Sequence, residues 1–176
     1  MKTIYLAAGC FWGSQAFYDR MTGVVETTVG YANGNTKNPR YEDLKHGLAT
    51  HAETVKITYD ENLISLEKIL DYYMVIVDPY SVNRQGGDIG VQYRTGIFYE
   101  DDEDEDYLRE YLTKREKELN MGKFAIILEP LKNFYPAEEY HQKYLVKNPH
   151  GYCHVDLNLV KKEDRKAWLS VLVKSF

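Results

Sequence analysis

Cys10 stands between an apolar run and the first segment that could form a helix, in the stretch GCFWG at residues 9–13. A strand from Thr3 to Ala8 followed at once by a helix from Cys10 would place the thiol beside unpaired backbone N–H groups and the positive end of the helix dipole. Thiols in such positions have pKa values below the free value of about 8.5. We therefore predict a nucleophilic cysteine here, with a buried and unreactive thiol as the alternative.

The side chains that could assist such a thiol are aromatic and polar. Phe11 and Trp12 adjoin it in the sequence and would form an apolar wall, which suits a methyl or thioether group better than a charged one. The polar candidates stand at the start of a predicted strand or beside loops: His51, Glu53, Asp88, Tyr41 and Tyr93. Their spacing does not prove that they converge, since acidic residues and tyrosines usually serve solvation and packing.

Cys153 is the second of the chain's two cysteines. In a reducing compartment, such a pair is more often catalytic or redox-active than a structural disulfide. It follows Pro149 and Gly151, in a segment whose composition permits movement. Two unrelated buried thiols are the alternative.

The elements that must position these residues follow from hydrophobic periodicity and from turn and capping signals. Alternation of apolar and polar residues predicts strands over residues 3–8, 24–31, 53–59, 93–99, 124–128 and 154–159. Helical spacing and capping predict helices from Cys10, over 41–47, from Ser65 to Asp78-Pro79, from the acidic run 100–106, over 136–147 and over 162–173. Residues 78–92 contain glycines without periodicity, and a loop of this size in a compact domain is usually functional or disordered.

This order of elements predicts an α/β (α+β) protein: a two-layer α/β sandwich with a ferredoxin-like plait, a mixed sheet and an extended C-terminal tail. We expect one domain over residues 1–160, followed by a helical extension over 161–176 that packs on it or acts as a linker. The net charge of −5 argues against a nucleic-acid partner, and no apolar segment has signal-peptide or membrane-spanning length. We therefore expect a cytoplasmic monomer without a membrane partner, a metal or a bound cofactor.

Several short motifs, taken in order, resemble the peptide methionine sulfoxide reductase A family. They are GCFWG at residues 9–13, YE at 41–42, HAE at 51–53, Asp88 before GVQYR at 90–94, YHQKY at 140–144 and GYC at 151–153. The resemblance covers residues 3–159 and implies that residues 1–160 are the catalytic domain. It also implies reduction of the S epimer of methionine sulfoxide, free or in oxidised proteins, with thioredoxin, or dithiothreitol in vitro, as the reductant.

The resemblance further implies a catalytic role for three residues. The Cys10 thiolate would attack the sulfoxide sulfur and end as a sulfenic acid, which Cys153 would resolve as a disulfide for thioredoxin to reduce. Glu53 would be the general acid, because a carboxyl group in an aromatic-walled pocket beside a thiolate has a raised pKa. No cysteine follows Cys153, so a single intramolecular disulfide is expected.

The other candidates would bind the substrate, again by resemblance. Tyr41 and Tyr93 would donate hydrogen bonds to the sulfoxide oxygen. Phe11 and Trp12 would hold the methyl group, and Asp88 would support the hydrogen bonds of the pocket. Gly87, before Asp88, departs from the asparagine that relatives often carry.

Two other functions stay open at this point. A cysteine hydrolase or acyltransferase would need a base for Cys10, for which the candidates are His51, His141 and His154. A structural zinc site in a non-catalytic module would use Cys153, His154, His150 and His141, which lack the paired C-x₂-C spacing of strong zinc signals.

Overall fold

The computed structural model of the chain describes residues 1–167. Its main sheet has six strands in the order β7-β6-β1-β3-β2-β8, and β4 pairs with β5 in a separate hairpin. The strands are β1 (Lys2–Ala8), β2 (Val24–Ala32), β3 (Ala52–Tyr59), β4 (Arg84–Gln85), β5 (Asp88–Ile89), β6 (Thr95–Tyr99), β7 (Ile127–Pro130) and β8 (Phe134–Pro136). The helices are α1 (Phe11–Asp19), α2 (Tyr41–Lys45), α3 (Leu66–Ile76), α4 (Asp102–Leu119) and α5 (Tyr144–Lys147), with short 3-10 helices η1 (Val91–Tyr93), η2 (Glu139–His141), η3 (Leu157–Leu159) and η4 (Lys162–Asp164).

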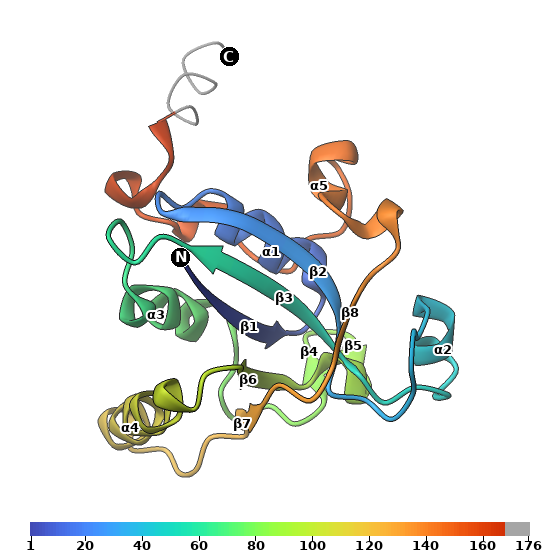
Figure 1. Cartoon of the computed structure of the whole chain (residues 1–176), viewed down its shortest axis with the longest axis horizontal. Helices are drawn as coiled ribbons and strands as arrows, with labels where there is room; N and C mark the ends of the chain where they lie inside the picture. The colour runs from blue at the N-terminus through green and yellow to red at the C-terminus, as the bar shows by residue number, and fades with distance from the viewer. Residues whose placement is uncertain (168–176) are drawn as a thin grey trace.

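The central strands β6-β1-β3-β2 are antiparallel neighbours. Helix α1 connects β1 to β2, and α3 leads from β3 toward β6, which is the βαββαβ connectivity of a ferredoxin-like plait. β7 pairs with β6 in parallel, and β8 pairs with β2 in antiparallel fashion, so the sheet is mixed. The predicted two-layer α/β sandwich with an extended C-terminal tail is confirmed (Figure 1).

The sheet curls so that its two outer strands approach each other. β7 and β8 lie at opposite edges, yet only residues 131–133 separate them in the chain. Six flat strands would place these edges about 24 Å apart, whereas the connecting Cα–Cα steps span at most about 15 Å. Asn33, just after β2, closes this end: its Nδ2 donates to Pro130 O at 3.0 Å and its Oδ1 accepts from Lys132 N at 2.7 Å.

Alternation along the strands divides the sheet into a helix-covered face and a concave face. On β1, Leu6 belongs to the large core beneath α1 and α3, whereas Tyr5 points to the concave face, where the Phe134 ring covers it at a centroid distance of 5.1 Å. On β3, Glu53 has the same parity as the core residue Val55. The Glu53 side chain therefore faces α1.

Residues 137–167, which we call the C-terminal segment, have little regular structure and are attached mainly through side chains. Gln142 binds the edge of β2 as a peptide group would: its Oε1 accepts from Val29 N at 3.1 Å and its Nε2 donates to Val29 O at 2.8 Å. Lys143 Nζ donates to Asp19 Oδ2 at 2.7 Å and to Thr27 Oγ1 at 2.8 Å. These contacts tie the segment to β2 and α1.

Two predictions for the C-terminal segment were wrong, and a third was wrong over its first residues. The helix predicted over 136–147 is broken into η2 and α5, because Lys143 adopts a left-handed conformation with a φ of 53°. The alternation over 154–159 does not form a strand, because this stretch begins by packing across α1, where His154 and Val155 lie beside Gly13. Of the helix predicted over 162–173, residues 162–164 form η4, and residues 168–173 lie outside the described part of the chain.

Smaller differences concern boundaries. The loop predicted over 78–92 contains the β4–β5 hairpin and leads into η1, which includes Tyr93, so the strand predicted from that residue starts at Thr95. The strand predicted over 124–128 begins at Ile127. β8 was not predicted, since three residues are too few for a periodic signal.

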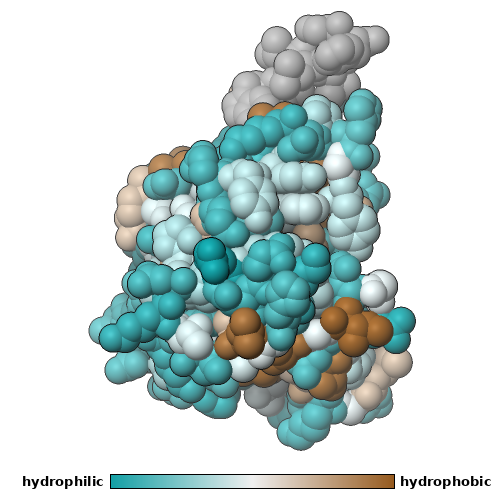
Figure 2. Space-filling view, turned by 90° about the vertical axis from the view of Figure 1, so that its right-hand side faces the viewer, coloured by the Kyte–Doolittle hydropathy of each residue, from teal (hydrophilic) through white to brown (hydrophobic). Residues whose placement is uncertain are grey.

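The surface is mainly hydrophilic on the side that carries α2 and α5. Figure 2 shows this side, where hydrophobic residues form separate spots instead of a continuous band. Within residues 1–167, no helix combines the length and the hydropathy that crossing a bilayer requires.

Candidate active site

The turn between β1 and α1 presents Cys10 as the N-cap of α1. Gly9 permits this turn, because its φ of 77° lies in the left-handed region, where other residues are strained. Gln85, on β4, clamps both sides of the turn: its Oε1 accepts from Cys10 N at 2.8 Å and its Nε2 donates to Ala8 O at 2.7 Å. The thiol is thus positioned by the backbone of β1 and α1 and by one distant amide.

Glu53 lies beneath the first turn of α1, with 2 % of its surface exposed. Its Oε1 accepts from Phe11 N at 3.3 Å, one of the N–H groups that a helix start leaves unpaired. Burial raises the pKa of this carboxyl group to about 8, the hydrogen bond from Phe11 opposes the rise, and the charge of Asp88 adds to it. The carboxyl group is therefore mostly protonated at neutral pH.

The Cys10 thiol does not have the low pKa that its place at a helix N-terminus predicts. Burial and, to a smaller extent, the negative charge of Glu53 raise the pKa of this thiol to about 12. The backbone N–H of Trp12 favours the thiolate without outweighing burial. Cys10 is consequently a neutral thiol in the free protein, and its proton must leave when the sulfur attacks.

A small cavity of about 100 Å³ brings most of the predicted residues together. It is lined by Cys10, Phe11, Trp12, Tyr41, Glu53, Asp88, Tyr93, His141 and Tyr152. A space of this kind needs roughly 10–15 Å³ to hold one water molecule, so the cavity is large enough for several non-hydrogen atoms. It can therefore hold the end of a side chain.

Aromatic contacts hold the wall of this cavity in place. The Trp12 indole stacks on Tyr144 with a centroid distance of 3.7 Å and an interplanar angle of 9°. Its Nε1 donates to His141 Nδ1 at 3.0 Å, so the hydrogen of the neutral His141 ring is on Nε2. The Phe11 ring meets His141 edge-on at 5.2 Å. The orientation of Trp12 is thus fixed from both sides.

Hydroxyl and carboxyl groups reach the cavity from α2, η1 and β5. Tyr41 and Tyr93 lie close enough for their hydroxyl groups to interact, and burial raises the pKa of both. Both phenols are therefore neutral donors at physiological pH. Asp88 accepts a hydrogen bond from the Tyr152 hydroxyl at 3.3 Å.

Cys153 does not line the cavity but lies beside α1. Its Sγ is 3.2 Å from the position that a Cβ on Gly13 would take, and it donates to Val155 O at 3.1 Å. Gly13 is three residues beyond Cys10, and residues at this spacing share a helix face. The two free thiols therefore lie near the same end of α1.

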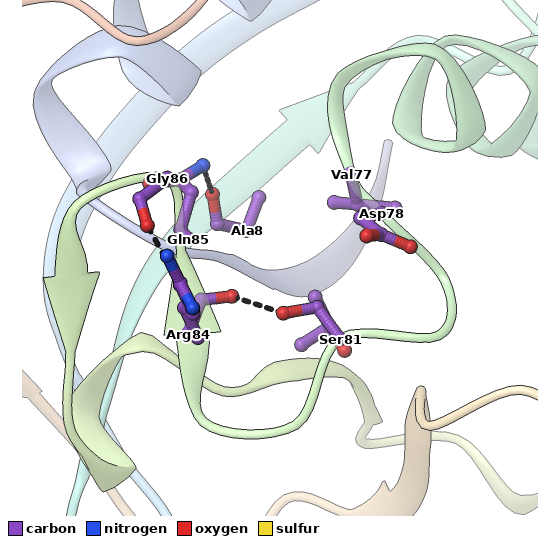
Figure 3. Close-up of a pocket in the computed structure, with 8 residues that line it drawn as sticks. Ala8, Val77, Asp78, Ser81, Arg84, Gln85 and Gly86 are labelled. Carbon is purple, nitrogen blue, oxygen red and sulfur yellow. Dashed lines mark hydrogen bonds between the residues drawn. The ribbon is translucent and has the colours of Figure 1, made fainter.

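A larger cavity, of about 420 Å³, shares Gln85 with the clamp on Cys10. Figure 3 shows its lining, in which Ser81 Oγ donates to Arg84 O at 2.6 Å and Arg84 Nε donates to Gly86 O at 2.9 Å. None of the predicted site residues belongs to this lining. The smaller cavity is therefore the candidate active site.

Comparison with known proteins identifies the family. A family model described as "Peptide methionine sulfoxide reductase" matches residues 2–171. The "Peptide methionine sulfoxide reductase MsrA" of Lachnoclostridium phytofermentans is 53% identical over 154 residues, which are 88% of this chain and 92% of the relative. The protein of the same name from Ureaplasma parvum serovar 3 is 50% identical over 165 residues, which are 94% and 99% of the two chains. This chain belongs to the peptide methionine sulfoxide reductase A family.

Solved structures of a relative share the fold. Mxr1 from Saccharomyces cerevisiae in its reduced form is 40% identical, with a TM-score of 0.79 over 86% of this chain and 88% of that one. An "unusual oxidized form" of Mxr1 is also 40% identical, with a TM-score of 0.62 over 86% and 85%. Mxr1 in complex with Trx2 matches at 32% identity and a TM-score of 0.56 over 81% and 84%. The chain is therefore an oxidoreductase of methionine sulfoxide, and its fold is nearest to the reduced form among these three.

The geometry does not favour the hydrolase or the zinc module. His51 and His154 do not line the cavity of this reductase, and His141 uses its acceptor nitrogen for Trp12, so none is placed as a base for Cys10. Within residues 1–167, no three His, Cys, Asp or Glu side chains gather into a group that could hold a metal ion.

Three residues that line or support the cavity were not assigned to a reductase site from the sequence, although His141 was considered as a base or a zinc ligand. His141 and Tyr152 stand within the motifs YHQKY and GYC, which could have suggested them. Gln85 has no such signal, because it acts from a separate hairpin on a turn 75 positions earlier in the chain.

Proposed function

We propose that this reductase acts on the S epimer of methionine sulfoxide, free or in oxidised proteins, through a Cys10 sulfenic acid that Cys153 resolves and thioredoxin recycles. The observation that carries this proposal is the cavity of about 100 Å³, which combines a thiol, a protonated carboxyl group, phenol donors and an apolar wall. Its size matches the sulfur, oxygen and methyl group at the end of the substrate side chain.

In the first step, Cys10 Sγ attacks the sulfoxide sulfur. Glu53, with its pKa raised to about 8, donates a proton to the sulfoxide oxygen and recovers one from the thiol. The attack forms a transient bond between Sγ and the substrate sulfur. This bond and the sulfur–oxygen bond of the substrate both break as the oxygen passes to Cys10. One thiol and one sulfoxide thus give one sulfenic acid and one methionine, without net uptake of protons.

The pocket would orient the substrate through its sulfoxide oxygen and its methyl group. Tyr41 and Tyr93 donate hydrogen bonds to the oxygen, which gains negative charge as its bond to sulfur breaks. The methyl group lies against Phe11 and Trp12, and Asp88 supports the network through Tyr152. A sulfur with its oxygen and methyl held on opposite walls accepts attack on one face only, which accounts for selection of one epimer.

In the second step, the Cys153 thiol attacks the Cys10 sulfenic acid, the disulfide forms, and water leaves. The dithiol of thioredoxin then reduces the disulfide by exchange and supplies the two electrons that the sulfoxide consumed. The complex of Mxr1 with Trx2 supports this reductant. A cytoplasmic location, where thiols are kept reduced, is compatible with this cycle.

We also propose that residues 1–160 are the catalytic domain and that residues 161–176 are an extension, of which the described part, residues 161–167, packs on the domain. Two contacts of Asp164 support this arrangement: its backbone oxygen accepts from Thr22 N at 2.8 Å, and its Oδ1 accepts from Lys68 Nζ at 2.7 Å.

Separate incubation with the two sulfoxide epimers tests the function. With dithiothreitol, we expect the S epimer alone to give methionine, and without a reductant we expect a Cys10–Cys153 disulfide in peptide mapping after one turnover. Consumption of the R epimer alone would contradict the assignment. Turnover that leaves Cys153 reduced would refute its role.

A further inference from the structure

Gly13 lies inside α1, where glycine is among the poorest helix formers. Its φ is not positive, so the backbone conformation does not require glycine at this position. The reason for the residue must therefore lie in what surrounds it.

The space beside Gly13 is occupied by residues that follow Tyr152. A Cβ at this position would lie 3.2 Å from Cys153 Sγ, 3.2 Å from Val155 Cγ2 and 3.3 Å from His154 Cε1. Optimal contacts between such atoms are about 3.5–4.0 Å. An alanine would consequently push this stretch outward by a few tenths of an ångström.

We propose that Gly13 forms a recess on α1 that holds the resolving thiol, and that Gly13 is a positioning residue for disulfide formation and not for oxygen transfer. This inference rests on the proposed function. In that step the Cys153 sulfur forms a bond to the Cys10 sulfur, the bond from Cys10 to its hydroxyl group breaks, and the hydroxyl leaves with the Cys153 proton as water.

The recess places the second thiol where this step needs it. Gly13 is three residues after Cys10, so a sulfur packed on Gly13 is about one helical turn from the Cys10 sulfur and on the same face. The hydrogen bond from Cys153 Sγ to Val155 O, at 3.1 Å, keeps the thiol in this place before it reacts. Glycine thus permits a close approach of Cys153 to α1, although it is a poor residue for the helix itself.

The test compares wild type, Gly13→Ala and Gly87→Ala during one turnover of methionine-S-sulfoxide without reductant. Gly87→Ala is the matched control, because a Cβ there would meet nothing within 4 Å. Methionine reports oxygen transfer, a dimedone adduct on Cys10 reports the sulfenic acid, and peptide mapping reports the disulfide. Thermal unfolding is measured on all three proteins.

For Gly13→Ala, we expect oxygen transfer within about twofold of wild type and disulfide formation slowed about tenfold, because a small displacement of a reacting atom costs rate steeply. The dimedone adduct should accumulate, and the melting temperature should not fall, since alanine favours the helix. An unchanged rate of disulfide formation, or equal slowing of both steps, would overturn the inference.

A second variant separates positioning from a general packing defect. Adding Val155→Ala to Gly13→Ala removes one of the three atoms that the new Cβ meets and gives the displaced stretch room, so it should restore part of the rate of disulfide formation. A double variant as slow as Gly13→Ala would contradict the recess. If wild type itself gives neither an adduct on Cys10 nor a disulfide, the proposed function fails independently of Gly13.

Discussion

The two cysteines belong to regions that are constructed differently. Cys10 sits between β1, in the middle of the sheet, and α1, and its backbone is clamped by Gln85. Cys153 belongs to the C-terminal segment, which side chains such as Gln142 and Lys143 attach to the core. A thiol fixed by backbone geometry meets every substrate in the same place, whereas a thiol on a segment held by side chains can move without disturbing the sheet. The difference matches a reaction whose first step needs a thiol at a constant place in the pocket and whose second step brings a thiol from another segment to it.

Replacing each cysteine by serine should separate the two regions most strongly. Cys10→Ser should lower methionine formation at least about 10³-fold, because the nucleophile is lost. Cys153→Ser should still give about one equivalent of methionine per chain before it stops, because only resolution is lost. Quantifying methionine in a burst experiment without reductant tests this, and continued turnover by Cys153→Ser with thioredoxin would contradict the assigned pair.

Changes at Glu53 should affect only oxygen transfer at Cys10 and not disulfide formation with Cys153. Glu53→Ala should slow oxygen transfer by about 10²- to 10³-fold, the usual contribution of a general acid. Glu53→Gln should slow oxygen transfer less, because an amide can still donate a hydrogen bond to the sulfoxide oxygen. Single-turnover rates at pH 7 measure this, with disulfide formation from a chemically generated sulfenic acid as the control step. Equal rates for all three proteins would remove Glu53 from the mechanism.

Glu53 should also make the free energy of unfolding of the protein depend on pH. Its folded pKa is raised to about 8 from 4.5, so its neutral form stabilises the fold at low pH, and this advantage is lost as pH rises from about 4.5 to 8. Between pH 5 and pH 9, the stability of wild type relative to Glu53→Gln should fall by roughly 3–4 kcal/mol. Urea unfolding at both pH values tests this, and a constant difference would argue against a buried, protonated carboxyl group.

The smallest effect is expected from weakening the attachment of the C-terminal segment to the core. Lys143→Met removes the hydrogen bonds to Asp19 and Thr27, and for a partly exposed ion pair this should cost about 1 kcal/mol. Hydrogen exchange should rise in residues 137–155 and not in β1. Lys147→Met, which alters a more exposed pair with Glu139, is the control. An equal rise of hydrogen exchange in residues 137–155 and in β1 would show that the two regions do not open independently.

The region around Cys10 was largely predictable from the sequence, because its residues follow the periodicities of strands and helices. Alternation places Leu6 and Glu53 on known faces, and the strand-to-helix turn at Cys10 follows from the change of period. Side chains of the pocket were found through their motifs. The raised pKa of Cys10 was not predicted, because it depends on burial beneath neighbours that are remote in the chain.

The C-terminal segment escaped prediction for a physical reason. Its conformation depends on tertiary contacts made by single side chains, and such contacts leave no period in the sequence. Lys143 adopts a left-handed conformation while its side chain binds Asp19, although its neighbours suggest a continuous helix. The alternation after His154 similarly arises without a strand, since Val155 packs against α1.

The binding of Gln142 to Val29 also bears on association between chains. β8 covers β2 from Gly30 to Ala32, and Ala137 N donates to Val29 O at 2.9 Å, which would leave the backbone N–H of Val29 open to a strand from another molecule. Gln142 Oε1 accepts from this N–H, and β7 at the opposite edge is short and likewise ends in a proline. The enzyme thereby protects its sheet edges against intermolecular pairing.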